Sequence, residues 1–277
     1  MPIIETTGEI VPKTPEEIEA MRRSGAITSG CLALLAGLTQ TMEDGEYSPV
    51  ELDLLANQFI EAHGGLAAFH GYSGFPGHIC ISVNHGVLHG IPNNLPLFAG
   101  DIVSFDVGTV LDGWYSDACI TVPVGDWQEL DDATIYLLRT NYASLQAGLE
   151  AAKVGAKTGV ISAALQRTIE DAGCNVVAGY DGHGIGRNLH EDPEIPSYGK
   201  GNEGKKIPSG LVICIEPLAT LGSGEAYTDE DGWTIFTEDH TPASHFEQMV
   251  AVTDAGVDIL TPYEGIDLEF LLGAREL

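Results

Sequence analysis

The sequence predicts an α/β (α+β) fold of two related halves, each with helices packed outside antiparallel strands. The hydrophobic period changes twice from helical to strand-like, so the order helix, helix, strands occurs twice. Two short patterns also recur in the same order. His-Gly-Ile occurs at 89–91 and 183–185, and a Gly-led apolar strand ends on a carboxylate at 100–106 and 210–216. We therefore expect an extension at 1–13 and one domain at 14–277, with pseudo-repeats at about 14–125 and 131–253.

Capping motifs define the helices of the first half. Thr14-Pro15-Glu16-Glu17 is a capping box with proline at the first helical position, and it predicts a helix to about Leu38. Ser48-Pro49-Val50-Glu51 has the same pattern and predicts a second helix that ends near Gly64. Apolar runs then predict strands at about 79–83, 101–111 and 114–122. Asp112-Gly113 predicts a two-residue hairpin turn between the last two strands.

The second half has the same order of elements. Asp131-Asp132 should cap a long helix with one apolar face, and another helix is expected at about 158–171. Strands are predicted at about 211–219, 233–237 and 247–253. No linker or low-complexity segment separates the halves, which favours a single domain with pseudo-twofold character.

The composition restricts the class of protein. Five cysteines without a C-x-x-C pair indicate reduced thiols, and neither a signal peptide nor an apolar run long enough to span a bilayer is evident. We therefore expect a soluble, cytoplasmic protein and a monomer. The net charge of −29, with only 12 Lys and Arg, argues against direct binding of nucleic acid.

Three carboxylates fall in strands that should be buried. Asp106, Glu216 and Glu247 each lie within or beside a strongly apolar run. An isolated buried carboxylate is very costly unless it is paired, protonated or bound to a metal ion. Pairing is scarce in a chain with so few basic residues, so the set indicates a site.

The predicted hairpin adds Asp117 to this set. With a two-residue turn, Gly108 lies opposite Asp117, and Asp106 is its neighbour on the same face. The two acids are then diagonal neighbours, roughly 7–8 Å apart at the backbone. Gly108 should leave open space between them. A register slip of one residue would place them on opposite faces, so the inference depends on the turn.

This set of side chains has the composition of a metal centre. Two acids so close cannot both ionise cheaply without a cation between them. Together with Glu216, Glu247 and a neutral imidazole from His183, they offer four negative charges, which two divalent ions balance. Oxygen ligands with one histidine suit Mn²⁺, Fe²⁺, Co²⁺ or Zn²⁺ without deciding among them.

Seven segments resemble type I methionine aminopeptidases. The match extends over nearly the whole chain, from about Thr14 to Thr253, and the segments that carry it lie at 13–25, 80–92, 101–125, 182–199, 215–217, 231–234 and 246–247. The resemblance implies the pita-bread fold in its short bacterial form. It also implies hydrolysis of the initiator methionine from nascent proteins and peptides, with a preference for a small second residue. The nucleophile would be a water or hydroxide that bridges two metal ions. Such a substrate would imply transient proximity to the ribosome.

The same resemblance assigns the metal ligands. Asp106 and Asp117 would hold one ion, with Asp106 and Glu247 bridging, and His183 and Glu216 would hold the other. Glu216 would also relay protons to and from the water. The free N-terminal amine of the substrate would bind a metal, which explains cleavage of the terminal residue alone.

Further residues are assigned to the substrate by the same match. His190 would stabilise the developing oxyanion, and His89 would hydrogen-bond the scissile amide nitrogen. The methionine pocket would be lined by Tyr72, Phe75, Cys80, Leu189 and Trp233, and Leu189 stands where the family often has Phe.

The chain also departs from the family pattern around the ligands. Gln248-Met249 follow Glu247, Tyr115-Ser116 precede Asp117, and His85 follows Asn84. These changes leave the five ligands intact but could alter metal affinity or rate. Five histidines have no assigned role. A second site at His78 and His85 is one interpretation of them, and loop histidines at the rim of the pocket are the more frequent case. The five are His70, His78, His85, His240 and His245.

Three alternatives remain open at this point. A pita-bread peptidase that cleaves before proline has similar ligands but usually carries a large N-terminal domain. A binding module that has lost catalysis, or a metal-free hydrolase of the creatinase kind, should have substituted ligands. His89-Gly90-Ile91-Pro92 and the segment around Cys80 favour the methionine type.

Overall fold

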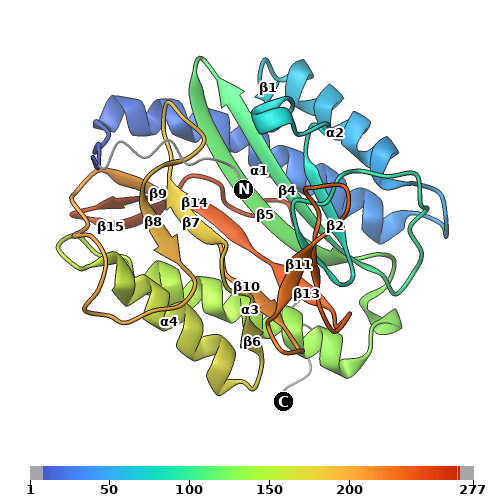
Figure 1. Ribbon diagram of the computed structural model, residues 1–277. Helices are drawn as coiled ribbons and strands as arrows, with labels where there is room; N and C mark the ends of the chain where they lie inside the picture. The colour runs from blue at the N-terminus through green and yellow to red at the C-terminus, as the bar shows by residue number, and fades with distance from the viewer. Residues whose placement is uncertain (1–8, 267, 269–277) are drawn as a thin grey trace.

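The computed structural model describes residues 9–266 and 268, with helices on the outside of a central sheet (Figure 1). The α-helices are α1 (Pro15–Thr41), α2 (Pro49–Ala62), α3 (Asp132–Ala151) and α4 (Thr158–Asp171). Short 3-10 helices lie at Tyr72–Gly74 and Trp127–Glu129. The parts of the expected extension and domain that fall on residues 1–8, 267 and 269–277 lie outside this description.

The strands form a central sheet and two three-stranded sheets. The central sheet contains β1 (Leu66–Ala67), β2 (Cys80–Val83), β4 (Ile102–Leu111), β5 (Trp114–Pro123), β7 (Asp181–Gly184), β8 (Glu191–Pro196), β9 (Leu211–Ile215), β14 (Glu247–Thr253) and β15 (Gly256–Ile259). The small sheets contain β3 (Gly86–Leu88), β6 (Asn175–Val176), β10 (Leu218–Thr220), β11 (Ala226–Thr228), β12 (Ile235–Thr237) and β13 (Ala243–His245).

Helices α1, α2 and α3 begin at the residues that the capping motifs predict. Thr14 accepts a hydrogen bond from the Glu17 backbone N–H at 3.3 Å, and the Thr14 N–H donates to the Glu17 carboxylate at 2.9 Å. The Ser48 N–H donates to the carboxylate three residues on, and Asp131 accepts from the Thr134 N–H. Each contact satisfies a backbone or side-chain group at a helix end, which explains why these starts are visible in the sequence.

The hairpin at Asp112-Gly113 has the predicted register. Both turn residues have positive φ, 53° and 75°, as a type I′ turn requires. Leu111 pairs with Trp114, and Gly108 therefore pairs with Asp117. The acids at 106 and 117 lie on one face of the sheet, as the sequence predicted.

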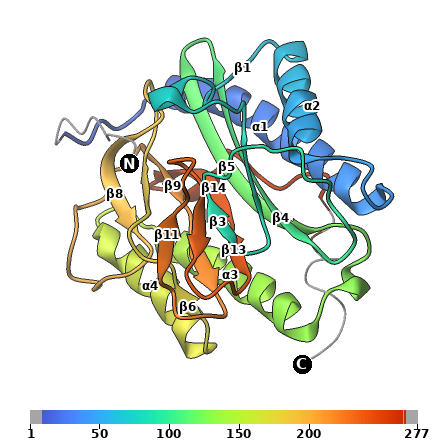
Figure 2. The same cartoon turned by 45° about the vertical axis from the view of Figure 1, so that its right-hand side comes forward.

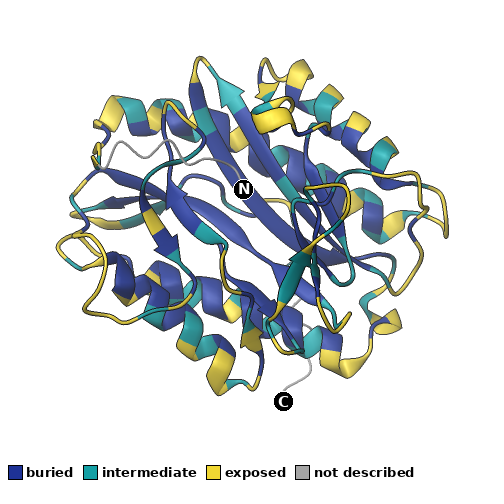
Figure 3. Ribbon diagram, viewed as in Figure 1, coloured by how far each residue is buried: buried dark blue, intermediate teal, exposed yellow. Residues whose placement is uncertain are grey.

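The two halves meet in the middle of the central sheet. Its strand order is β1-β4-β5-β14-β9-β7-β8, so β5 of the first half pairs with β14 of the second. Helix α1 packs on β4 and β5, while α3 and α4 pack together on the other half (Figures 1 and 2). Buried residues follow the central strands, and exposed residues follow the outer faces of the helices (Figure 3). The sheet thus places the junction of the halves deep in the molecule.

The expected strand at 211–219 was wrong as a single element. It ends at Ile215, and β10 begins at Leu218 in a different sheet. Pro217 stands between them and has no N–H to donate to a ladder, so the chain leaves the sheet directly after Glu216.

The expected strand at 233–237 begins two residues late. The N–H groups of Trp233 and Thr234 both donate to the Asp231 carboxylate, at 2.7 and 2.8 Å, so they form a turn instead of a ladder. Trp233 therefore lies in a loop at the start of β12.

All five cysteines are free and buried, which agrees with the expectation of reduced thiols. Among the described residues, no helix combines the length and apolarity that crossing a membrane requires.

Candidate active site

All of the residues predicted for the site line one pocket of about 800 Å³. The predicted residues are Tyr72, Phe75, Cys80, His89, Asp106, Asp117, His183, Leu189, His190, Glu216, Trp233 and Glu247. They come from both halves of the chain, and the two His-Gly-Ile repeats both contribute a histidine. The pocket therefore lies where the halves face each other.

Strand register explains how the first half contributes its acids. Asp106 pairs with Cys80 of β2 on one side and with Cys119 of β5 on the other. Cys119 in turn pairs with Glu247 of β14. Directly paired residues of antiparallel strands share a face, and so do residues two apart on a strand, so Asp117 joins this row.

The second half completes the site from β7 and β9. Gln248 pairs with Ile215, which brings Glu216 at the end of β9 beside Glu247. His183 lies in β7, and its Nε2 is 3.6 Å from the Glu216 carboxylate. Among residues 9–266 and 268, three groups of metal-donor side chains have donor atoms within 4.8 Å of one another, and Glu247 belongs to all three: Asp106, Asp117 and Glu247; Glu216, His245 and Glu247; and His183, Cys214 and Glu247. It is the residue that the donors have in common.

Burial and crowding disfavour ionisation of the four carboxyl groups. Burial raises the pKa of Asp106 to about 7. Burial, followed by the nearby carboxylates, raises the pKa values of Asp117, Glu216 and Glu247 well above their usual range. A cation within the cluster would reverse this effect, because an opposite charge favours the ionised form.

The imidazoles at the site are held neutral. Burial lowers the pKa of His183 and of His89 to about 4. Burial, followed by repulsion from the rings of His183 and His89 in their protonated forms, lowers the pKa of His190 to about 2. The Nδ1 of His183 lies 2.9 Å from the Gly184 carbonyl oxygen, which can only accept, so Nδ1 carries the hydrogen and Nε2 keeps a lone pair.

The carboxylates fit a divalent metal centre. One oxygen each of Asp106, Asp117 and Glu247 is buried without a hydrogen-bond partner in the part of the chain that the structure describes. Buried polar atoms in native proteins are nearly always satisfied, so three such atoms in one cluster need an explanation. Metal ions at ~2.0–2.2 Å from each oxygen would satisfy all three. The charge of four carboxylates balances two divalent ions.

Residues 19–254 match the family described as Metallopeptidase family M24. The chain belongs to this family. "Methionine aminopeptidase 1" of Bacillus subtilis is 41% identical over 252 residues, which is 91% of this chain and 99% of the relative. "Methionine aminopeptidase 1" of Mycobacterium tuberculosis is 39% identical over 91% of this chain and 95% of its own.

Solved structures of the metallopeptidase family have the same fold. A methionine aminopeptidase from Rickettsia prowazekii superposes with a TM-score of 0.87 at 34% identity, covering 92% of this chain and 100% of that one. A prolidase from Pyrococcus furiosus has a TM-score of 0.71 at 22% identity, over 92% of this chain and 66% of that one. The second likeness shows the pita-bread fold alone.

Two further features position histidines of this metallopeptidase site. The Tyr72 hydroxyl lies 2.8 Å from Nδ1 of His190, a contact that the sequence did not predict. His89 has a positive φ of 55°, which few non-glycine residues adopt, and Gly90 beside it lies against the Ile81 backbone where a Cβ would clash at 2.2 Å. The backbone there is fixed tightly enough to hold a strained conformation.

The apolar part of the pocket is formed by rings. Phe75 and Trp233 meet edge to face at 5.2 Å between ring centroids, and His89 lies 6.3 Å from Trp233. Phe69 also reaches the pocket and fills the space expected to be open at Gly108: a Cβ on Gly108 would lie 2.5 Å from its ring. That expectation was wrong, because the glycine makes room for an aromatic side chain.

Two of the departures from the family pattern lie behind the metal ligands. Ser116 is buried and points to α1, where its hydroxyl meets Ser24 and Thr28 at 2.9 and 2.8 Å. Gln248 is buried, and its amide nitrogen lies 3.3 Å from the Thr261 carbonyl. Side chains of successive strand residues point to opposite faces, so neither reaches the pocket.

Four of the unassigned histidines lie in two pairs. His78 stacks on His70 and contacts Asp53 at 2.7 Å, whereas His85 packs against His240. His78 and His85 are therefore in different places, which contradicts the idea that they form one second site. The fifth, His245, lies at the metal-donor cluster, although nothing in the sequence marks it as part of the site.

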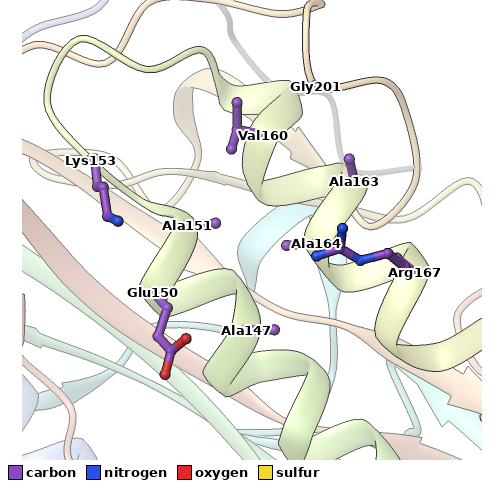
Figure 4. A pocket seen from close by; sticks show the side chains of 9 residues that line it. All are labelled: Ala147, Glu150, Ala151, Lys153, Val160, Ala163, Ala164, Arg167 and Gly201. Atoms are coloured by element: carbon purple, nitrogen blue, oxygen red, sulfur yellow. The ribbon is translucent and has the colours of Figure 1, made fainter. Parts of the chain in front are cut away.

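A second hollow of about 400 Å³ lies between α3 and α4 (Figure 4). Small alanine side chains form its floor, with Glu150, Lys153 and Arg167 around it. It shares no lining residue with the pocket of the candidate active site. It is therefore separate from that site.

Proposed function

We propose that this chain is a metal-dependent aminopeptidase that hydrolyses the N-terminal methionine of nascent proteins and peptides, with a preference for a small second residue. One observation carries the proposal: five metal-donor side chains and an aromatic pocket meet in one cavity. The chain's relatives at about 40% identity over 91% of its length, which are called methionine aminopeptidases, support the same activity.

The five ligands that we propose are Asp106, Asp117, His183, Glu216 and Glu247. Glu247 is central to the donor groups, which supports a bridging role for it. Asp106 and Asp117 share one of these groups with Glu247, which supports binding of the same ion by both aspartates. Two bound ions would supply an activated water for attack on a peptide bond.

Other side chains act on the substrate. Glu216 stands at the end of β9 with its carboxylate on the pocket, where it can take a proton and pass it to the leaving amine. The neutral ring of His190 carries one N–H and is oriented by the Tyr72 hydroxyl. It can therefore donate a hydrogen bond to a carbonyl oxygen as negative charge develops there. His89 faces the same pocket and can hydrogen-bond the amide nitrogen.

The methionine side chain would lie among Tyr72, Phe75, Cys80, Leu189 and Trp233. Phe75, Cys80 and Leu189 are nearly inaccessible to solvent, so they form a dry wall. Sulfur makes favourable contacts with aromatic rings, which supports an unbranched thioether as the side chain bound. The edge-to-face pair of Phe75 and Trp233 leaves ring faces and edges for such contacts.

The alternative functions have less support. The prolidases that suggest cleavage before proline are 22% and 19% identical to this chain, and such likenesses show the fold alone. A binding protein without catalysis would not need to retain all five donors in a buried cluster. The donors are intact and crowded together, which supports catalysis.

We propose that the enzyme acts as a cytoplasmic monomer, with transient proximity to the ribosome but no direct contact with nucleic acid. The net charge of −29 supports the last point, because phosphate backbones would be repelled. We also propose that residues 14–277 form one catalytic domain after an extension at 1–13. The continuous central sheet that joins the halves supports this division.

The test is release of methionine from short peptides after removal of metal with EDTA and re-addition of Mn²⁺, Fe²⁺, Co²⁺ or Zn²⁺ in turn. Met-Ala-Ser should be cleaved and Ala-Pro-Ala should not, and activity should depend on added metal. Asp106→Asn should abolish turnover while the far-UV circular dichroism spectrum is retained. Cleavage of Ala-Pro-Ala in preference, or activity that ignores EDTA, would contradict the proposal.

A further inference from the structure

His245 is a buried histidine without a hydrogen bond at either ring nitrogen. It lies at the end of β13 with 1% of its surface exposed, and both Nδ1 and Nε2 lack a hydrogen-bond partner among the described residues. Burying such polar atoms costs free energy unless something compensates for it. A ring of this kind in a native core therefore indicates a ligand.

The ring faces two carboxylates of the metal cluster. Its Nε2 lies 3.7 Å from Glu216 Oε2 and 3.9 Å from Glu247 Oε2. Both separations are too long for a hydrogen bond. They are short enough for three donor atoms that surround one ion.

The main chain fixes this position. The His245 N–H donates to the Thr121 hydroxyl at 2.8 Å, and the Thr121 hydroxyl lies 2.8 Å from the His245 carbonyl oxygen. The Cys119 thiol also approaches that carbonyl, at 3.6 Å. These contacts tie β13 to β5 of the other half, so the imidazole is held where it is by its backbone.

Without a hydrogen bond, Nε2 has no favourable contact with the two carboxylate oxygens that it faces. A neutral Nε2 with its lone pair toward two carboxylates would face only other lone pairs. A cation between the three atoms removes that conflict.

We propose that His245 is a sixth protein ligand of the metal centre, and that its Nε2 binds the ion held by His183, Glu216 and Glu247. This rests on the metal centre of the proposed function. Two ligands at ~2.1 Å from one ion can be at most about 4.2 Å apart. His245 Nε2 satisfies that limit with the Oε2 atoms of Glu216 and Glu247, at 3.7 and 3.9 Å, and His183 Nε2 satisfies it with the other Glu216 oxygen, Oε1, at 3.6 Å.

The proposal makes the two metal positions unequal. One ion would have two imidazoles beside its carboxylates, and the other would have the carboxylates of Asp106, Asp117 and Glu247 alone. Imidazole suits Zn²⁺ and Co²⁺, whereas an all-carboxylate site suits Mn²⁺. The nitrogen-rich position should therefore fill first when Zn²⁺ or Co²⁺ is added.

The direct test is zinc X-ray absorption on the full chain, stripped with EDTA and then given one equivalent of Zn²⁺. Two imidazoles per zinc are expected in the wild-type protein and one in His245→Gln. His85→Gln is the control, because His85 packs against His240 outside the pocket, and it should keep two. A single imidazole per wild-type zinc would overturn the proposal.

Isothermal titration with Zn²⁺ gives an independent result. His245→Phe keeps a ring of similar size without donors, so the first zinc should bind at least about 10-fold more weakly. The metal-free variant should also melt at a higher temperature than the metal-free wild type, since a buried unpartnered imidazole has been removed. If the zinc affinity of this folded variant is within about two-fold of wild type, His245 is not a ligand.

Failure of this inference is distinguishable from failure of the proposed function. One imidazole per zinc in a wild-type protein that releases methionine would overturn the ligand alone. Two imidazoles per zinc in a protein that releases no methionine with any metal would support the ligand and overturn the activity.

Discussion

Asp106→Asn should make the metal-free protein more stable at neutral pH, although the same change removes a metal ligand. Burial raises the pKa of Asp106 from its usual 3.8 to about 7, so the folded metal-free state binds a proton that the unfolded state releases. Stability then falls as pH rises from the unfolded pKa through the folded one. Asparagine has no proton to lose and escapes this loss.

The size of the effect follows from the same values. The difference between 3.8 and about 7 corresponds to about 4 kcal/mol in total, of which about 2–3 kcal/mol develops between about pH 5 and pH 8. Divalent metal should reverse the order, because the wild type gains an ion–carboxylate contact that the variant lacks.

The assay is urea unfolding of EDTA-treated wild type and Asp106→Asn at several pH values in that range. The stability difference between the two proteins isolates the carboxyl group from the general repulsion of a chain with charge −29. Asp112→Asn is the matched control, since Asp112 is exposed at the tip of the same hairpin and its difference from wild type should stay flat. A difference for Asp106→Asn that changes by less than about 1 kcal/mol over this range would refute the buried, metal-dependent role of the acid.

Three further outcomes are expected. Tyr72→Phe removes the hydroxyl that orients His190, so kcat should fall about five-fold for a lost hydrogen bond of ~1 kcal/mol, with little change in metal affinity; an unchanged kcat would contradict this role. Trp233→Ala should raise KM for Met-Ala-Ser more than it lowers kcat, and the reverse split would place the ring at the reacting bond instead. Ser116→Ala should lower urea stability by about 1–3 kcal/mol because buried hydroxyl partners are left unsatisfied, while kcat/KM stays near the wild-type value.

The parts of the fold that could be predicted are those fixed by local chemistry. The capping boxes at Thr14 and Ser48 and the Asp112-Gly113 turn are chemical requirements of a helix start and a hairpin. Once the turn is known, pairing of Gly108 with Asp117 follows by counting, and the convergence of two acids follows from the pairing. The site was accessible from the sequence for this reason.

The parts that could not be predicted depend on contacts distant in sequence. The strands β3, β6, β11 and β13 have two or three residues each, too short for an alternating pattern, and they exist because other strands pair with them. His245 belongs to one of them, so nothing nearby in the sequence marks it as part of the site. The hydroxyl of Tyr72 likewise finds His190 across 118 positions of the chain.

The position of the metal cluster at the junction of the halves has a structural consequence. Strands β4 and β5 share ten residue pairs, whereas β5 and β14 share two, at Cys119 and Ala118. The Tyr263 hydroxyl strengthens this short join, since it accepts from the Glu247 N–H at 3.1 Å and donates to the Cys119 carbonyl at 2.7 Å. Metal ions held by Asp106 and Asp117 on one side and by Glu216 and Glu247 on the other would add a second link at this junction, where the central sheet joins the halves by two residue pairs. Loss of metal should therefore loosen the junction before either half, because the repelling carboxylates then face each other across it.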